Sequence, residues 1–286
     1  MNRDKPLPPT RCGNMELRWG ERTYIMGVCN LSPDSFSGDG LGDNVEATVA
    51  QAKRMVAEGA DIIDVGGEST RPGTEPMSVD DVDAELRLVI PALERLAGGL
   101  TVPLSIDTYK AGVASRALKA GASMINDIWG LKRDPGIARV AAEAGVPIIL
   151  MANQRDAPPR AGIMAKVIAD LERSISLAME SGVTEENIIV DPGIGFGKSL
   201  EQNLELIKRL FELKRLHRPI LLGTSRKSVI GLVLDLPADQ RLEGNLAITA
   251  IGIASGADMV RVHDVKPTAR VCRMSDAIIR RGAVDD

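Results

Sequence analysis

Short apolar runs alternate along the chain with longer segments in which apolar residues recur at helical spacing. The first apolar run, Tyr24–Asn30, ends in a polar loop that leads into a helical segment at 44–58, and the same unit recurs seven more times. Strands that are apolar almost throughout are typical of a parallel sheet covered on both faces. The predicted strands cover residues 24–30, 60–67, 102–107, 122–127, 146–151, 187–191, 219–224 and 257–263.

Eight such units favour a closed (β/α)8 TIM barrel, an α/β fold that typically takes about 250 residues. The alternative is an open doubly wound sheet, which usually has fewer strands. Glycines precede several of the strands, where each would end the preceding helix as a C-cap. These glycines are Gly59, Gly121, Gly145 and Gly256. No linker or shift in composition divides the chain, so residues 14–286 are predicted to form a single barrel domain.

The N-terminal residues lie outside the repeated unit. Residues 1–13 are rich in proline and charge, and they are predicted to be a disordered lead-in. Residues 15–23, with Gly20 in the middle, predict a short hairpin before the barrel begins.

Composition limits the classes of partner. The net charge of −4 and the aromatic content of 2% argue against nucleic acid and anionic membranes as partners. An anionic small molecule would therefore have to be met by a local cluster of cations. The three cysteines include no C-x-x-C pair, and no apolar stretch has the form of a secretory signal or a membrane span. A cytoplasmic protein is expected.

Polar residues gather where the predicted strands end, which in a barrel of this kind is the active-site face. One set offers donors and acceptors suited to a flat, nitrogen-rich heterocycle: Asp107, Asn126, Asp191 and Lys227. A second set suits an anionic group, together with a metal: Asn30, Thr70, Arg71, Arg261 and His263. A zinc or iron site built on histidine is not predicted because the chain has only two histidines, whereas magnesium held by an amide and substrate phosphates fits.

The loop that follows Asp191 contains glycines at positions 193, 195 and 197 and ends at Lys198. It suggests a phosphate-binding loop at first sight. A Walker A motif would need glycine at position 192, which is proline, and the dinucleotide-binding spacing also fails. The loop is therefore interpreted as a tight turn that holds the Asp191 carboxylate at the mouth of a strand.

Seven motifs in order resemble those of the dihydropteroate synthase family. The segment 26–37 resembles one family signature, and the segment 59–73 resembles the other. The remaining motifs lie at 105–110, 125–127, the Asp191 loop, 225–228 and 261–265. The resemblance spans about residues 24–270, most of the chain.

The resemblance implies a transferase that joins 6-hydroxymethyl-7,8-dihydropterin pyrophosphate to p-aminobenzoate in folate synthesis, belongs to the target class of sulfonamides, and forms a homodimer. It implies that the pterin contacts Asp107, Asn126, Met151, Asp191 and Lys227. It implies that Mg²⁺ is bound by Asn30 and that the pyrophosphate contacts Asn30, Thr70, Arg71, Arg261 and His263. It implies a p-aminobenzoate pocket made by Phe36, Thr70, Arg71, Pro72, Phe196, Lys227 and Ser228, with the loops 32–37 and 70–73 closing over it. The expected catalytic residues are Asp107, Asp191, Lys227, Arg261 and His263.

The expected mechanism is a dissociative substitution at the pterin methylene. Pyrophosphate departs first, assisted by cationic groups, and Asp191 stabilises the charge that develops on the ring. The arylamine, which is neutral near pH 7, then attacks without a strong general base.

One position departs from the family pattern. Family members usually have histidine after the Leu-Met that ends the fifth strand, and here Ala152 follows Met151. Ala152 keeps one alternative open, a non-catalytic pterin-binding paralogue. A second alternative is a methyltetrahydrofolate-binding methyltransferase on the same kind of barrel. The p-aminobenzoate loops at 32–37 and 70–73 count against the methyltransferase.

Overall fold

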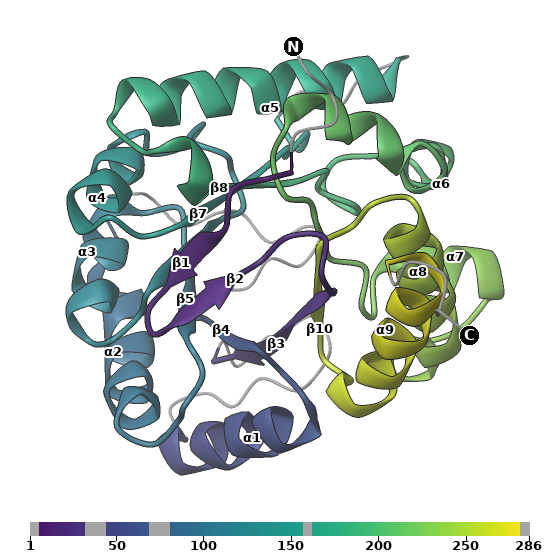
Figure 1. Cartoon of the computed structure of the whole chain (residues 1–286). Coiled ribbons are helices and arrows are strands. Elements are labelled where there is room, and N and C mark those ends of the chain that lie inside the picture. Colours follow the sequence, from purple (N-terminus) through teal and green to yellow (C-terminus); the bar gives the residue numbers. More distant parts are fainter. Residues whose placement is uncertain (1–5, 32–43, 69–80, 157–161, 281–286) are drawn as a thin grey trace.

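The computed structural model describes residues 6–31, 44–68, 81–156 and 162–280, in which eight parallel strands form a barrel (Figure 1). The strands are β3 (Tyr24–Asn30), β4 (Ile62–Gly66), β5 (Leu104–Asp107), β6 (Met124–Asp127), β7 (Ile148–Met151), β8 (Ile188–Asp191), β9 (Leu221–Leu222) and β10 (Met259–Val262). The order around the sheet is β8-β7-β6-β5-β4-β3-β10-β9. A parallel bridge between Val190 and Ile220 joins its two ends, with the Val190 amide donating to the Pro219 carbonyl at 2.9 Å. The barrel is closed, which confirms the predicted fold and excludes the open sheet.

Helices surround the barrel and connect its strands (Figure 1). They are α1 (Val45–Glu58), α2 (Asp83–Ala97), α3 (Ala111–Lys119), α4 (Gly136–Ala144), α5 (Ile163–Glu180), α6 (Leu200–Lys208), α7 (Ser228–Leu234), α8 (Leu242–Ala254) and α9 (Val265–Ile279), with 3-10 turns at η1 (Glu185–Asn187), η2 (Leu210–Leu216) and η3 (Ala238–Gln240). Gly59 and Gly145 end α1 and α4 in the left-handed conformation, as predicted from their place before a strand.

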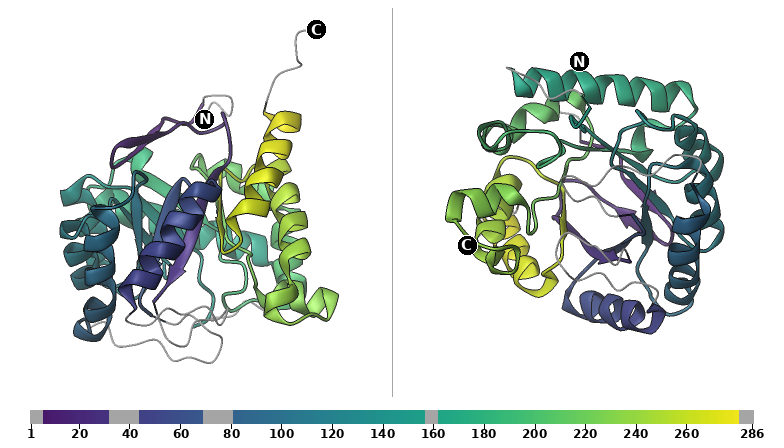
Figure 2. Two further views of the ribbon diagram at one scale, coloured as in Figure 1. Left: turned by 90° about the horizontal axis from the view of Figure 1, so that it is seen from below. Right: turned by 180° about the vertical axis from the view of Figure 1, so that it is seen from behind.

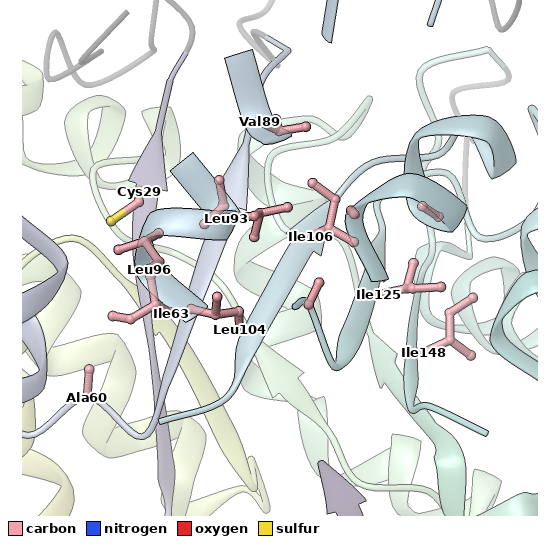
Figure 3. Close-up of a cluster of buried hydrophobic side chains, with 14 of the residues drawn as sticks. Cys29, Ala60, Ile63, Val89, Leu93, Leu96, Leu104, Ile106, Ile125 and Ile148 are labelled. Atoms are coloured by element: carbon pink, nitrogen blue, oxygen red, sulfur yellow. The ribbon is translucent and has the colours of Figure 1, made fainter. Parts of the chain in front are cut away.

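Side chains alternate along each strand between the helices and the barrel interior. Outward-facing Ile63, Leu104 and Ile106 belong to a core cluster with Leu93 and Leu96 of α2 (Figure 3). Inward-facing apolar side chains fill the barrel near the N-terminal ends of the strands. They are Met26, Ile62, Met124, Ile149, Ile189, Leu221 and Met259. Toward the C-terminal ends of the strands the inward positions become polar, as at Asp64, Asp107, Asn126 and Arg261.

The N-terminal hairpin differs from the prediction. It pairs β1 (Thr10–Cys12) with β2 (Met15–Leu17), turning at Gly13 and Asn14, so the predicted hairpin at 15–23 is wrong. The expectation of a disordered lead-in as far as residue 13 is also wrong for residues 10–12. These residues are ordered because Cys12 and Leu17 are buried against the apolar end of the barrel. Figure 2 shows the hairpin lying across one end of the barrel. Within the described residues, no helix is long and apolar enough to cross a membrane.

Candidate active site

A pocket opens at the C-terminal ends of the strands, as the barrel fold predicts. Side chains from most of the strands and from the loops that follow them line it. The lining residues are Asn30, Asp107, Asn126, Ile128, Met151, Arg155, Asp191, Gly195, Phe196, Gly223, Ser225, Lys227, Ser228, Arg261 and His263. Ten of the predicted site residues are therefore brought together, although they are spread from position 30 to position 263.

Arg261 lies in the middle of a charged network at the pocket floor. Its Nε donates to Asp64 Oδ2 at 2.6 Å, and its Nη2 donates to Asp107 Oδ2 at 2.7 Å. Asn126 Nδ2 also donates to Asp64 Oδ2, at 3.0 Å. The network links the two sets of residues that were predicted separately, because Arg261 was assigned to the anion and Asp107 to the heterocycle.

The network changes the titration of its members. Burial raises the pKa of Asp107 to about 7, and Arg261 only partly offsets this effect. Burial would lower the pKa of Arg261, but the Asp64 and Asp107 carboxylates raise it. Arg261 therefore stays cationic, while Asp107 changes its charge near neutral pH.

Asp191 and Lys227 form the other charged pair of the pocket. Asp191 Oδ1 accepts a hydrogen bond from the Gly193 amide at 2.7 Å, and Lys227 Nζ donates to the Ile194 carbonyl at 2.6 Å. Burial raises the pKa of Asp191, and the Lys227 ammonium lowers it in part. Burial also lowers the pKa of Lys227 to about 8, against the attraction of Asp191. Each charge helps to keep the other group ionised although both groups are buried.

The Phe196 ring lies close to two cations. Lys227 Nζ lies 4.7 Å from the ring centroid, and Arg155 Cζ lies 4.6 Å from it. Cations at this distance are attracted to the negative face of the ring. Phe196 therefore provides an apolar surface beside groups that can bind a carboxylate.

Lys198 holds the loop that carries Phe196 through hydrogen bonds to backbone carbonyl groups. The Lys198 ammonium donates to the carbonyl oxygens of Ala152 at 2.7 Å, Gly193 at 2.7 Å and Phe196 at 3.2 Å. A Cβ at Gly193 would stand 2.4 Å from the Ala152 carbonyl oxygen, so only glycine permits this approach. The loop is a tight turn that holds Asp191, as predicted.

The predicted anion site lies at the same end of the barrel. His263 Nδ1 lies 2.9 Å from Ser225 Oγ, and both residues line the pocket together with Arg261 and Asn30. The described residues contain no group of three or more histidine, cysteine, aspartate or glutamate side chains that could enclose a metal. The Asn30 amide still fits Mg²⁺, because this ion is commonly held by few protein ligands, several waters and substrate phosphates.

Sequence reasoning missed part of the site, and part of the predicted site lies outside the described residues. Arg155, Ile128, Gly195 and Gly223 line the pocket without having been predicted, and Ser225 and Asp64, although they lie at predicted strand ends, were given no role. Ile128 follows Asn126 by two residues, a spacing that could have signalled its position. The predicted residues Phe36, Thr70, Arg71 and Pro72 lie outside the described part of the chain, as do the loops 32–37 and 70–73.

Comparison with known proteins identifies the family. The family model for pterin binding enzymes matches residues 26–263. A dihydropteroate synthase of Clostridium beijerinckii is 51% identical to the chain over 272 residues, which cover 95% of the chain and 100% of that protein. The chain belongs to the dihydropteroate synthase family.

Solved dihydropteroate synthases share the fold over nearly their whole length. A Clostridium difficile dihydropteroate synthase crystallised in the presence of pteroic acid has a TM-score of 0.86 at 50% identity, with 92% of this chain and 99% of that chain covered. The Yersinia pestis enzyme in complex with a sulfonamide drug has a TM-score of 0.88 at 36% identity, with 95% and 98% covered. The predictions of the dihydropteroate synthase family and of a transferase are confirmed.

Proposed function

We propose that the chain condenses 6-hydroxymethyl-7,8-dihydropterin pyrophosphate with p-aminobenzoate, giving 7,8-dihydropteroate and pyrophosphate. The observation that carries this proposal is that a single pocket contains both a ring-recognising set, the residues suited to a flat heterocycle, and the cationic residues suited to an anion. Family membership supports the same reaction.

The pterin ring is recognised at the pocket floor. A pterin presents ring nitrogens and an exocyclic amine as donors, and ring nitrogens and a carbonyl as acceptors. The Asp107 and Asp191 carboxylates and the Asn126 carbonyl accept from the donors, and Lys227 donates to an acceptor. Met151 lines the same part of the pocket and supplies apolar contact with a ring face.

The pyrophosphate lies beside Arg261 and His263. Arg261 binds the leaving group as a cation, because its pKa is raised by the two carboxylates at the floor. Asn30 would hold Mg²⁺ next to the pyrophosphate, and the bound ion would neutralise phosphate charge. Arg261 and His263 stabilise the charge that accumulates on the leaving oxygens.

The chemical step is a dissociative substitution. The bond from the pterin methylene to the pyrophosphate oxygen breaks, and both electrons leave with the pyrophosphate. The resulting cation is delocalised into the dihydropterin ring, next to the Asp191 carboxylate. The amine of p-aminobenzoate then forms the new carbon–nitrogen bond and loses a proton. No described side chain is needed as a strong base.

The p-aminobenzoate ring packs against Phe196, beside Lys227 and Ser228. The cations near Phe196 favour a substrate that carries a carboxylate on a flat ring. Phe36, Thr70, Arg71 and Pro72 complete this pocket in the proposal, with Thr70 and Arg71 also contacting the pyrophosphate.

The functional unit is a homodimer. Its interface is formed by α7, α8 and α9, which lie next to one another in the chain's fold (Figure 1). After Asn245 the residues of α8 are apolar except Thr249, and Ile253 is buried while Ile251 is 52% exposed. A helix that is apolar on its outer side as well as its inner side is normally covered on both. α9 adds Met274, exposed by 64%, and Ile278, exposed by 68%.

Complementation tests the function. The chain should restore growth to a bacterial strain that lacks its dihydropteroate synthase, and a sulfonamide should abolish the rescue in competition with p-aminobenzoate. The second candidate, a non-catalytic pterin-binding paralogue, is motivated by Ala152. It predicts a folded protein that binds pterin in vitro and fails to rescue growth.

A further inference from the structure

Asp64 is a fully buried carboxylate that lies inside the barrel beneath the pocket. It belongs to β4, and it is not among the side chains that line the pocket. Its Cα pairs with that of Ser105 on β5, in the layer below Asp107. Burying a charge at such a depth is costly unless the charge is paired and hydrogen-bonded.

Both hydrogen bonds to Asp64 come from residues of the pocket. A single oxygen, Oδ2, accepts from Arg261 Nε at 2.6 Å and from Asn126 Nδ2 at 3.0 Å. In the described part of the chain, Asp64 Oδ1 and Ser105 Oγ are both buried and have no hydrogen-bond partner. The carboxylate is therefore directed at two ligand-facing side chains rather than at its own strand neighbours.

The contact decides which way the Asn126 amide faces. An ionised carboxylate only accepts hydrogen bonds, so the amide must turn its NH₂ group toward Asp64. The Asn126 carbonyl oxygen is thereby turned away from Asp64, and Asn126 lines the pocket. An amide held in this way offers an acceptor to a ring edge that carries N–H donors.

The same oxygen orients Arg261. Two of the three guanidinium nitrogens are committed to carboxylates, Nε to Asp64 and Nη2 to Asp107. The fork geometry of a guanidinium fixes the plane of the group once two of its nitrogens are held. Asp64 therefore sets the direction in which Arg261 faces the pocket.

We propose that Asp64 is a positioning residue for pterin recognition: it touches no substrate, and it fixes the acceptor face of Asn126 and the plane of Arg261. This inference rests on the proposed function, because it names how Asn126 of the ring-recognising set and Arg261 of the pyrophosphate-binding set are held in that same site.

Three variants separate this role from a structural one. Asp64→Leu has nearly the same size but no acceptor. Asp64→Asn keeps an acceptor at the position of Oδ2 and can turn its NH₂ group to Ser105 Oγ. Ser105→Ala is the matched control, because it lies at the same depth and contacts neither Asn126 nor Arg261 in any hydrogen bond shown. If Asp64→Leu does not fold, Asp64→Ser replaces it, since a serine hydroxyl is too short to reach both donors.

The measurements are calorimetric binding of a pterin without pyrophosphate and the KM values for both substrates. We expect Asp64→Leu to weaken binding of this pterin roughly tenfold or more, since Asn126 loses the acceptor that orients its amide. Its KM for the pterin substrate should rise by a similar factor, and its KM for p-aminobenzoate should change by less than about threefold. Asp64→Asn should recover most of the affinity, and Ser105→Ala should match the wild type.

Three results would overturn the inference. These are wild-type pterin affinity in Asp64→Leu, an equal rise of both KM values, and an Asp64→Asn variant as weak as Asp64→Leu. Each would leave the proposed function intact provided that the wild type binds pterin and turns over. A wild type that binds no pterin would overturn both.

Discussion

Burial changes the titration of two side chains that line the pocket. The pKa of Asp107 is raised to about 7 and that of Lys227 is lowered to about 8. Below the first value Asp107 is protonated and loses the charge with which it accepts ring N–H groups. Above the second value Lys227 is a neutral amine and no longer balances Asp191. The raised pKa of Asp107 and the lowered pKa of Lys227 together narrow the range of pH in which both groups are ionised.

We therefore expect a bell-shaped pH dependence of kcat/KM for the pterin substrate, which reports the ionisation of the free enzyme. The lower limb should lie near pH 7 and the upper limb near pH 8. Asp107→Asn should lower activity and remove the lower limb, because the group that titrates there is gone. An Asp107→Asn profile with an unchanged lower limb would show that another group controls it.

At the scale of elements, the ends of β7 and β8 are joined through Lys198. Its three carbonyl acceptors come from Ala152 after β7 and from Gly193 and Phe196 after β8. Burial lowers the pKa of Lys198 to about 7, and Asp191 opposes this effect. The lysine holds the loop that carries Asp191 and Phe196 without facing either substrate in the proposal.

Replacing Lys198 by methionine should loosen this loop. The buried carbonyl oxygens would lose their donor, and we expect the free energy of unfolding to fall by about 1–3 kcal/mol in urea titrations. Because Phe196 is on the loop, the KM for p-aminobenzoate should rise. Lys208→Met, at an exposed position on α6, is the control and should change neither quantity. If Lys198→Met were less stable but had an unchanged KM for p-aminobenzoate, the prediction that this loop positions the substrate would be contradicted.

The strands that are buried along their whole length could be predicted from the sequence. Each barrel strand is apolar because both of its faces are covered, so periodicity revealed all eight. β1 and β2 have three residues each, too few for a periodic pattern, and they are ordered by pairing with each other and by packing on the barrel end. The polar residues at the strand ends could be predicted once the strands were located. The hydrogen bond between Arg261 and Asp107 could not be predicted, because the two residues are 154 positions apart in the sequence.

At the scale of the whole molecule, the apolar surface of α7, α8 and α9 predicts assembly. Ile251→Glu combined with Met274→Glu places charges where the proposed interface would exclude water, so we expect a monomer in sedimentation velocity at micromolar concentration. Phe211→Glu is the control, because Phe211 is 54% exposed on η2, outside these helices. A double variant that sediments as the wild type does would contradict this interface.

The proposed function requires that the single pocket at the C-terminal ends of the strands catalyse the whole condensation. Its most direct test is incubation of the purified chain with 6-hydroxymethyl-7,8-dihydropterin pyrophosphate, p-aminobenzoate and Mg²⁺, followed by quantification of both products. We expect 7,8-dihydropteroate and pyrophosphate in equal amounts, and at least about a hundredfold slower formation in a folded Lys227→Met variant, which loses a ring contact and the partner of Asp191. The absence of 7,8-dihydropteroate from a folded wild type that binds both substrates would contradict the claim.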